Sequence, residues 1–245
     1  MEKIKFPVII LINPQMPENI GMSARAMMNC GFSELRIVNP RERWPNNIAV
    51  KSAAHGSFIL DKAKIFNNFE TSTKDLKFLI GTSVRKRFAN KNHFFDFESL
   101  FKSFPTSSKV GIVFGPERSG LTNEQISKCD CIFSLPIYKN KSSLNLSHSI
   151  LLVAYEFSKL NIKKNNHKNN TIKNIATKKE FYQMMNHLRD ELEDSGFFHP
   201  LEKAKSMFLN IQNMLIRANF TSQEIRTFRG IIRNLSKSRN SNKDY

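Results

Sequence analysis

Five short runs of apolar, often β-branched residues recur through the first 160 residues of the chain. They lie at residues 8–12, 35–38, 77–80, 110–114 and 131–135. Runs of this length without polar alternation are typical of strands that are buried on both faces, as in a parallel sheet. The pattern therefore predicts a parallel sheet with a layer on each side.

Between these runs the apolar residues take helical spacing. A helix is predicted over 19–30, and a longer apolar helix over 144–160. Thr122 and Gln125 have the spacing of a capping box, which predicts a short helix ending near Lys128. Strands that alternate with helices indicate an α/β domain.

The pattern changes after residue 160. Residues 161–179 are rich in Asn and Lys and poor in apolar residues, which is typical of a linker. Three helices are then predicted: 179–194, a second from Pro200 to about residue 218, and a third opened by a capping box at 221–224. We therefore divide the chain into an α/β domain (1–160), a linker (161–179) and a helical domain with a basic tail (180–245).

The charge of the chain points to a polyanionic partner. Lys and Arg number 38 against 21 Asp and Glu, a net charge of +17 in 245 residues. Nucleic acid is the usual partner of so basic a protein, although drift in an AT-rich genome produces the same Lys and Asn enrichment. The odd count of three cysteines argues against a disulfide framework and for a reducing, cytoplasmic setting. Neither a signal peptide nor a membrane span is expected.

The common nucleotide-binding and metal-binding motifs are missing from the sequence. No GxGxxG follows the first apolar run, and no GxxxxGK[ST] occurs. The pair Cys129-x-Cys131 has no second pair at ligand spacing, so we expect buried thiols and no metal site.

Four polar segments follow the predicted strands: 13–25, 81–87, 115–120 and 135–149. In open α/β sheets ligands bind outside the carboxyl ends of the strands, so these segments are expected to build one pocket. Ordinary turns are the alternative, because Gly, Pro, Asn and Ser are common turn residues.

The segment GPERSG (115–120) has the glycines of a phosphate loop but carries an acid, Glu117. That carboxylate disfavours an anion, and the glycines permit close approach of a neutral ligand. Arg25, Arg85 and Arg87 suit the phosphates of a second, polyanionic ligand. The pocket is thus expected to hold a non-anionic cofactor beside a nucleic-acid backbone.

Three ordered motifs carry a resemblance to a known family. They are Asn19-Ile-Gly-x-x-x-Arg25, FGPERSGLT over 114–122, and SSLNL over 142–146. The chain resembles the SpoU branch of the SPOUT RNA 2′-O-methyltransferases, and within it the TrmJ type, which methylates the pyrimidine at position 32 of the tRNA anticodon loop. The likeness includes the GTSVR loop (81–85) and the helical appendage with its FRGII segment (228–232).

The resemblance implies a parallel sheet with a deep trefoil knot, a homodimer with the active site near its interface, tRNA as the partner, and S-adenosylmethionine as the cofactor. By motif match, the cofactor pocket comprises Thr82, Ser83, Val84, Gly115, Leu135, Ser142, Ser143, Leu144 and Asn145. Pro116 stands where TrmJ-type enzymes often carry Arg, and this departure bears on RNA contacts.

The resemblance also assigns roles in catalysis. Arg25 is the catalytic residue, and our hypothesis is that it grips a phosphate and polarises the ribose 2′-OH. Asn19 would orient Arg25, and Glu117 would position Arg25 or a loop amide. Arg25, Arg85, Arg87 and the basic C-terminal helices are expected to contact RNA. The alternatives are a SpoU enzyme acting on rRNA or another tRNA position, and a non-catalytic RNA-binding module of the same fold.

Overall fold

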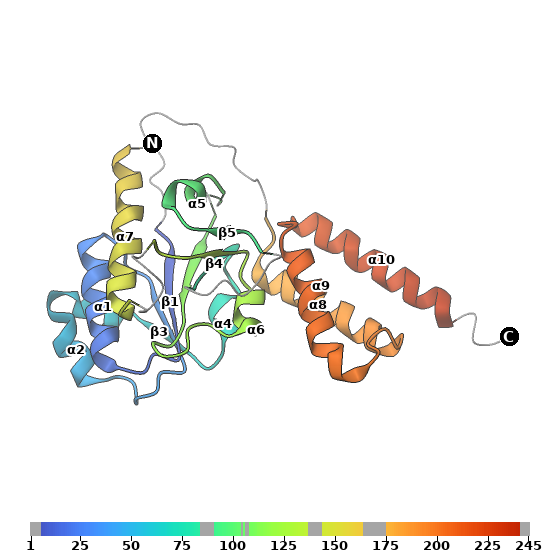
Figure 1. Ribbon diagram of the computed structural model, residues 1–245, viewed down its shortest axis with the longest axis horizontal. Coiled ribbons are helices and arrows are strands. Elements are labelled where there is room, and N and C mark those ends of the chain that lie inside the picture. Colours follow the sequence, from blue (N-terminus) through green and yellow to red (C-terminus); the bar gives the residue numbers. More distant parts are fainter. Residues whose placement is uncertain are drawn as a thin grey trace.

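A computed structural model describes residues 6–83, 91–103, 105, 108–136, 144–163 and 175–240, without the side chains of 160–163 and 237–240. Within these residues, seven strands form one parallel sheet in the order β3-β2-β1-β6-β4-β7-β5 (Figure 1). The strands are β1 Val8–Ile12, β2 Leu35–Val38, β3 Lys64–Phe66, β4 Phe78–Thr82, β5 His93–Phe94, β6 Val110–Phe114 and β7 Cys131–Phe133.

The five predicted strands are all present, and the two that were not predicted lie at the edges of the sheet. β3 has three residues, and its Lys64 and Ile65 are exposed. β5 has only two residues and pairs on one side, with β7. Edge strands this short contain too few apolar residues to form a recognisable run in the sequence.

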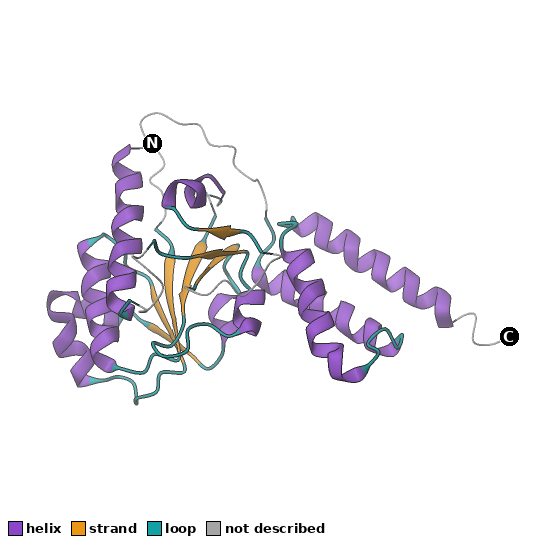
Figure 2. Cartoon of the chain, viewed as in Figure 1, coloured by secondary structure: helices purple, strands orange, loops and turns teal. Residues whose placement is uncertain are grey.

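Helices cover both faces of the sheet (Figure 2). Strand β1 shows why, since its side chains alternate between two cores. Ile9 and Leu11 belong to a core shared with α1 and α7, whereas Ile10 belongs to a core that includes Phe69 of α4 and Ile126 of α6. The helices of this part are α1 Pro17–Asn29, α2 Asn47–Ala53, α3 Ser57–Asp61, α4 Phe69–Thr73, α5 Phe97–Ser103, α6 Asn123–Ser127 and α7 Leu146–Lys163.

The C-terminal segment is helical, as the sequence predicts. It comprises α8 Lys178–Asp194, a 3₁₀ turn Leu201–Lys203, α9 Ala204–Ile216 and α10 Ser222–Asn240, around a core of its own. Both predicted capping boxes are confirmed: Thr122 with Gln125 opens α6, and Thr221 exchanges hydrogen bonds with Glu224. Helix α7 continues to Lys163, beyond the predicted end at residue 160.

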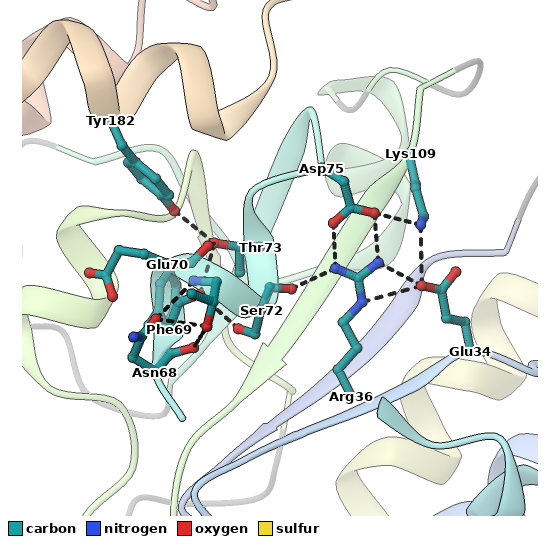
Figure 3. Close-up of polar contacts among 11 residues, drawn as sticks. Glu34, Arg36, Asn68, Phe69, Glu70, Ser72, Thr73, Asp75, Lys109 and Tyr182 are labelled. Atoms are coloured by element: carbon teal, nitrogen blue, oxygen red, sulfur yellow. Dashed lines mark hydrogen bonds and ion pairs between the residues drawn. The ribbon is translucent and has the colours of Figure 1, made fainter. Parts of the chain in front are cut away.

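The first turns of α8 fasten the helical segment to the sheet domain. The Nζ atom of Lys178 lies 2.6 Å from the carboxylate of Asp130, and both side chains are 5% exposed. The backbone N–H of Lys178 donates to the carbonyl of Leu76 at 2.9 Å. Tyr182 points from α8 to Thr73, with 2.9 Å between their oxygens (Figure 3). Removing one member of such a buried ion pair leaves an uncompensated charge, so these contacts hold the two parts in one arrangement.

A second charged cluster lies at the amino edge of the sheet (Figure 3). The side chain of Arg36 is 2% exposed, and its guanidinium donates to both carboxylate oxygens of Asp75, at 2.5 and 2.8 Å. It also donates to Glu34 at 2.6 Å, and Lys109 joins the same two acids. Hydrogen bonds from Arg36 hold the pKa of the Asp75 carboxyl well below its usual range. This arginine is fully engaged within the fold.

Candidate active site

Four loops leave the sheet at its carboxyl edge, as predicted. The strands β1, β6, β4 and β7 are consecutive neighbours and all run parallel, so their carboxyl ends lie together. The loops after them carry the polar segments that begin at 13, 115, 83 and 134. One edge of the sheet thus gathers segments that lie far apart in the sequence.

A cavity of about 100 Å³ lies between these loops. Five predicted cofactor residues line it: Thr82, Ser83, Gly115, Leu135 and Leu144. Three others, Val84, Ser142 and Ser143, lie outside the described residues, as do Arg85 and Arg87. The remaining wall consists of Phe114, Pro116, Glu117, Gly120, Phe133, Leu146 and Ser149.

The polar groups of the cavity wall are largely engaged by the protein. Thr82 Oγ1 donates to the carbonyl of Val113 at 2.9 Å, and the Ser83 N–H donates to the carbonyl of Phe133 at 3.1 Å. The hydroxyl of Ser134 donates to the Ser83 carbonyl. What remains is a mainly apolar wall, which suits a flat ring better than a phosphate group.

Glu117 binds the backbone just before α1. The capping position of α1 is Met16, whose side chain makes no capping hydrogen bond. The carboxylate of Glu117 accepts instead from the backbone N–H groups of Gln15 and Met16, at 2.9 and 3.4 Å. A negative group is favoured at a helix N-terminus. The acid in GPERSG therefore lies near the N-terminus of α1 and ties the loop after β6 to the loop after β1.

A line of hydrogen bonds joins the three sequence motifs. Asn19 Nδ2 donates to Glu117 Oε1 at 2.8 Å, and Asn145 Nδ2 donates to Asn19 Oδ1 at 2.8 Å. Asn145 Oδ1 accepts in turn from the backbone N–H and the hydroxyl of Ser147. Asn19 is only 2% exposed. The Asn19 amide is hydrogen-bonded through both its nitrogen and its oxygen, so this Asn145–Asn19–Glu117 line fixes the three loops relative to one another.

Arg25 lies apart from this line. It is exposed on α1, and within the described part of the chain its side chain makes no hydrogen bond or ion pair with Asn19 or Glu117. Glu117 was expected to position either Arg25 or a loop amide, and it contacts the loop amides of Gln15 and Met16. Arg25 therefore keeps its guanidinium available for a ligand or for a second chain.

Gly115 is needed for a reason that differs from the one expected. A Cβ atom there would lie 2.3 Å from the backbone N of Leu121 and 2.4 Å from the carbonyl carbon of Gly120. Contacts this short do not occur, so only glycine lets the loop fold back on itself. Gly120 has φ +65° and closes the turn by donating to the carbonyl of Pro116 at 2.8 Å.

Sequence reasoning missed several residues of this site. Gln15 supplies a backbone N–H to Glu117, and Ser134 holds the Ser83 carbonyl. His93 Nε2 lies 2.7 Å from the Ser134 hydroxyl. Phe114 and Phe133 end their strands beside predicted residues, and that position is the one signal that would have found them.

A larger cavity, about 520 Å³, lies elsewhere, between the sheet domain and the helices α8 and α9. None of the predicted site residues lines it. Its acids and bases are mixed, and Lys128 already pairs with Glu70 and Glu124. The smaller cavity therefore remains the candidate active site, because the motif residues gather there.

Among the described residues, no group of three or more His, Cys, Asp or Glu is placed to hold a metal ion. All three cysteines are buried and free, and burial raises the pKa of Cys129 to about 12. In the same part of the chain, no helix has the length and apolarity to cross a membrane.

Two family models match the chain. The model of the SpoU rRNA Methylase family matches residues 7–155, which include all three motifs and the whole sheet. The chain belongs to the SpoU methylase family. The model of the tRNA methyltransferase TrmJ C-terminal domain matches residues 179–244.

Other SpoU proteins resemble the chain over most of its length. The TrmJ tRNA (cytidine/uridine-2′-O-)-methyltransferase of Pectobacterium atrosepticum is 29% identical over 237 residues, 94% of this chain and 96% of that protein. The TrmJ tRNA (cytidine-2′-O-)-methyltransferase of Methanocaldococcus jannaschii is 40% identical over 151 residues, 60% of this chain and 65% of that protein. The crystal structure of TrmJ from Z. mobilis ZM4 superposes with a TM-score of 0.84 at 33% identity, covering 94% of this chain and 99% of that one.

Proposed function

We propose that the chain is a tRNA ribose 2′-O-methyltransferase that takes its methyl group from S-adenosylmethionine and acts on the pyrimidine at position 32. The observation that carries the proposal is the Asn145–Asn19–Glu117 line beside the cavity. It joins the three SpoU motifs at one edge of the sheet. The TrmJ-type C-terminal match and the TrmJ relatives favour tRNA over rRNA.

The cavity suits the methyl donor in chemistry. Its apolar walls include Phe114, Phe133 and Leu135, and Thr82 and Ser83 stand at the end of β4. S-adenosylmethionine, when bound, supplies an electrophilic methyl group. Residues 84–90 and 137–143 lie outside the described part of the chain. Thr82, Ser83, Gly115, Leu135 and Leu144 are the described residues that would hold the cofactor, with Asn145 fixing the loop that Leu144 begins.

A ribose 2′-OH is a weak nucleophile, so positioning and help with its proton are required. Arg25 is exposed, and its planar guanidinium matches phosphate geometry. In our proposal it binds a phosphate next to the target ribose and polarises the 2′-OH by hydrogen bonding. Asn19 and Glu117 act indirectly, because they fix the loops that shape the site.

The proposal includes a homodimer. Helices α1 and α7 lie side by side and leave apolar side chains exposed: Met22 on α1, and Leu151, Leu152 and Tyr155 on α7. Arg25 lies on the same helix as Met22, so a second copy packed on this face would bring Arg25 to the interface. The trefoil knot, the division at 160 and 180, and the cytoplasmic setting remain predictions.

A single methyl-transfer assay tests this function. Purified protein is incubated with labelled S-adenosylmethionine and a tRNA transcript that is either all-ribose or carries a 2′-deoxynucleotide at position 32. We expect transfer to the first and none to the second. Equal transfer to both transcripts would contradict position 32, and transfer to an rRNA fragment alone would favour the rRNA alternative.

Arg25→Ala tests the catalytic assignment. We expect kcat to fall by roughly 100-fold or more, on the scale of removing one preorganised charge-stabilising donor. Arg25→Lys keeps the charge but loses the planar fork, so a partial loss is expected. Near-normal turnover by Arg25→Ala with tRNA bound would exclude the role.

A further inference from the structure

A further loop lies beside the loops after β1 and β6, which lead into two of the three SpoU motifs. Strand β1 pairs in parallel with β6 on one side and with β2 on the other. The loop after β2, residues 39–46, therefore leaves the sheet at the same edge as the loops of Asn19 and Glu117. We call residues 39–46 the β2 loop.

The β2 loop is held at several points along its length. The backbone N–H of Arg41 donates to the carbonyl of Pro14 at 3.1 Å, which ties the loop to the segment that Glu117 binds. Trp44 packs against the main core. Asn46 caps α2 by accepting from the backbone N–H of Ile48 at 2.9 Å. The loop thus presents its outward side chains from a fixed backbone.

Those outward side chains are two arginines and an acid. Arg41, Glu42 and Arg43 are all exposed, and so is Arg118 in the loop after β6. Within the described residues, none of the three arginines forms an ion pair with a carboxylate. Glu117, next to Arg118, is already occupied by loop amides and Asn19. Lysine outnumbers arginine in this chain, yet these loop positions carry the planar fork that matches phosphate.

We propose that Arg41, Arg43 and Arg118 form a contact surface for the sugar-phosphate backbone of the substrate RNA, beside the Asn19–Glu117 site. This rests on the proposed function, since it takes RNA as the substrate. The surface positions the RNA through its phosphates and carries no base specificity. It extends the RNA contact region beyond Arg25, Arg85 and Arg87.

The test compares two double variants that remove the same charge from opposite edges of the sheet. Arg41→Gln/Arg43→Gln changes the β2 loop, and Lys62→Gln/Lys64→Gln is the matched control at the amino end of β3, where both lysines are exposed. Binding of an unmodified tRNA transcript is measured at several salt concentrations. Calorimetry measures binding of S-adenosylmethionine, and turnover is measured at saturating tRNA.

We expect the arginine variant to bind tRNA roughly 10- to 30-fold more weakly at 0.1 M salt. Each lost phosphate contact raises log Kd by roughly 0.7 at this salt concentration, and the variant loses two. The slope of log Kd against log salt falls by about 1.4 for the same two contacts. Its kcat and its affinity for S-adenosylmethionine stay at wild-type values. The lysine control stays near wild type, and Arg118→Gln alone lowers the slope by about 0.7.

Two results would overturn the proposal while leaving the enzyme function intact. One is a wild-type tRNA affinity and salt slope in Arg41→Gln/Arg43→Gln. The other is an equal loss in the lysine control, which would show an effect of net charge alone. A wild-type protein that neither binds nor methylates tRNA would instead overturn the proposed function and this surface together.

Discussion

Arginines lie at both ends of the parallel strands, at the amino edge and at the carboxyl edge, but their contacts differ. At the amino edge, Arg36 is buried and bonded to Asp75 and Glu34, with Lys109 bridging the same acids (Figure 3). At the carboxyl ends of the strands, Arg25 and Arg41 are exposed, and Glu117 is bonded to the backbone amides of Gln15 and Met16.

This difference separates charges that hold the fold from charges that are free to bind. A guanidinium whose donors are taken by carboxylates and a carbonyl has little left for a ligand. An exposed guanidinium on a fixed backbone gains from meeting a phosphate. The contrast predicts that substitutions at the amino edge change stability, whereas substitutions at the carboxyl edge change RNA binding and methyl transfer.

The largest expected effect is on stability. Arg36→Ala leaves Asp75 and Glu34 with only Lys109, and it removes the donor to the Ser72 carbonyl. We expect the free energy of unfolding to fall by about 3 kcal/mol, the lower end for a broken buried pair, because the acids are partly exposed. Urea unfolding measures it. A loss below about 1 kcal/mol would show that the network is only a surface feature.

The second effect distinguishes positioning from folding at the carboxyl edge. Glu117→Ala removes the acceptor of the Gln15 N–H and of the Asn19 amide. We expect kcat for methyl transfer to fall roughly 100-fold, with a loss of about 1 kcal/mol of stability, typical of a lost hydrogen bond. Glu117→Gln keeps one acceptor oxygen and should recover part of kcat. If the measured kcat falls only in proportion to the fraction of folded protein, Glu117 contributes to stability alone.

The smallest effect is the pH dependence of the amino edge. The pKa of Asp75 lies below its usual value in the folded protein, so its stabilising contribution is present above about pH 4. That contribution is lost as the pH falls through the lowered pKa. The stability difference between wild type and Asp75→Asn should shrink from about 1 kcal/mol at pH 6 toward zero at acid pH. A difference that does not change with pH would contradict the assignment.

The sequence was sufficient where a single segment determines its own structure. An unbroken apolar run predicts a buried strand such as Val8–Ile12, and the capping boxes at Thr122 and Thr221 mark helix starts. The edge strands β3 and β5 escaped because pairing with a neighbour, not local sequence, makes them strands.

Contacts between distant segments were beyond the sequence. Glu117 was singled out by its position in GPERSG, but its bond to Gln15 spans 102 residues and follows only from the pairing of β1 with β6. The pair between Asp130 and Lys178 links the two parts of the chain and has no local signal at either residue. Pairwise geometry of this kind depends on strand order, which a single sequence does not encode locally.

The most direct measurement finds which atom of the tRNA receives the methyl group from S-adenosylmethionine. Wild-type protein and Asn19→Ala are each incubated with labelled S-adenosylmethionine and unmodified tRNA, and the RNA is digested and read by mass spectrometry. We predict the label on the ribose 2′-oxygen of nucleotide 32 with wild type and its near-complete loss with Asn19→Ala. Label on a base, or full labelling by Asn19→Ala, would contradict the account.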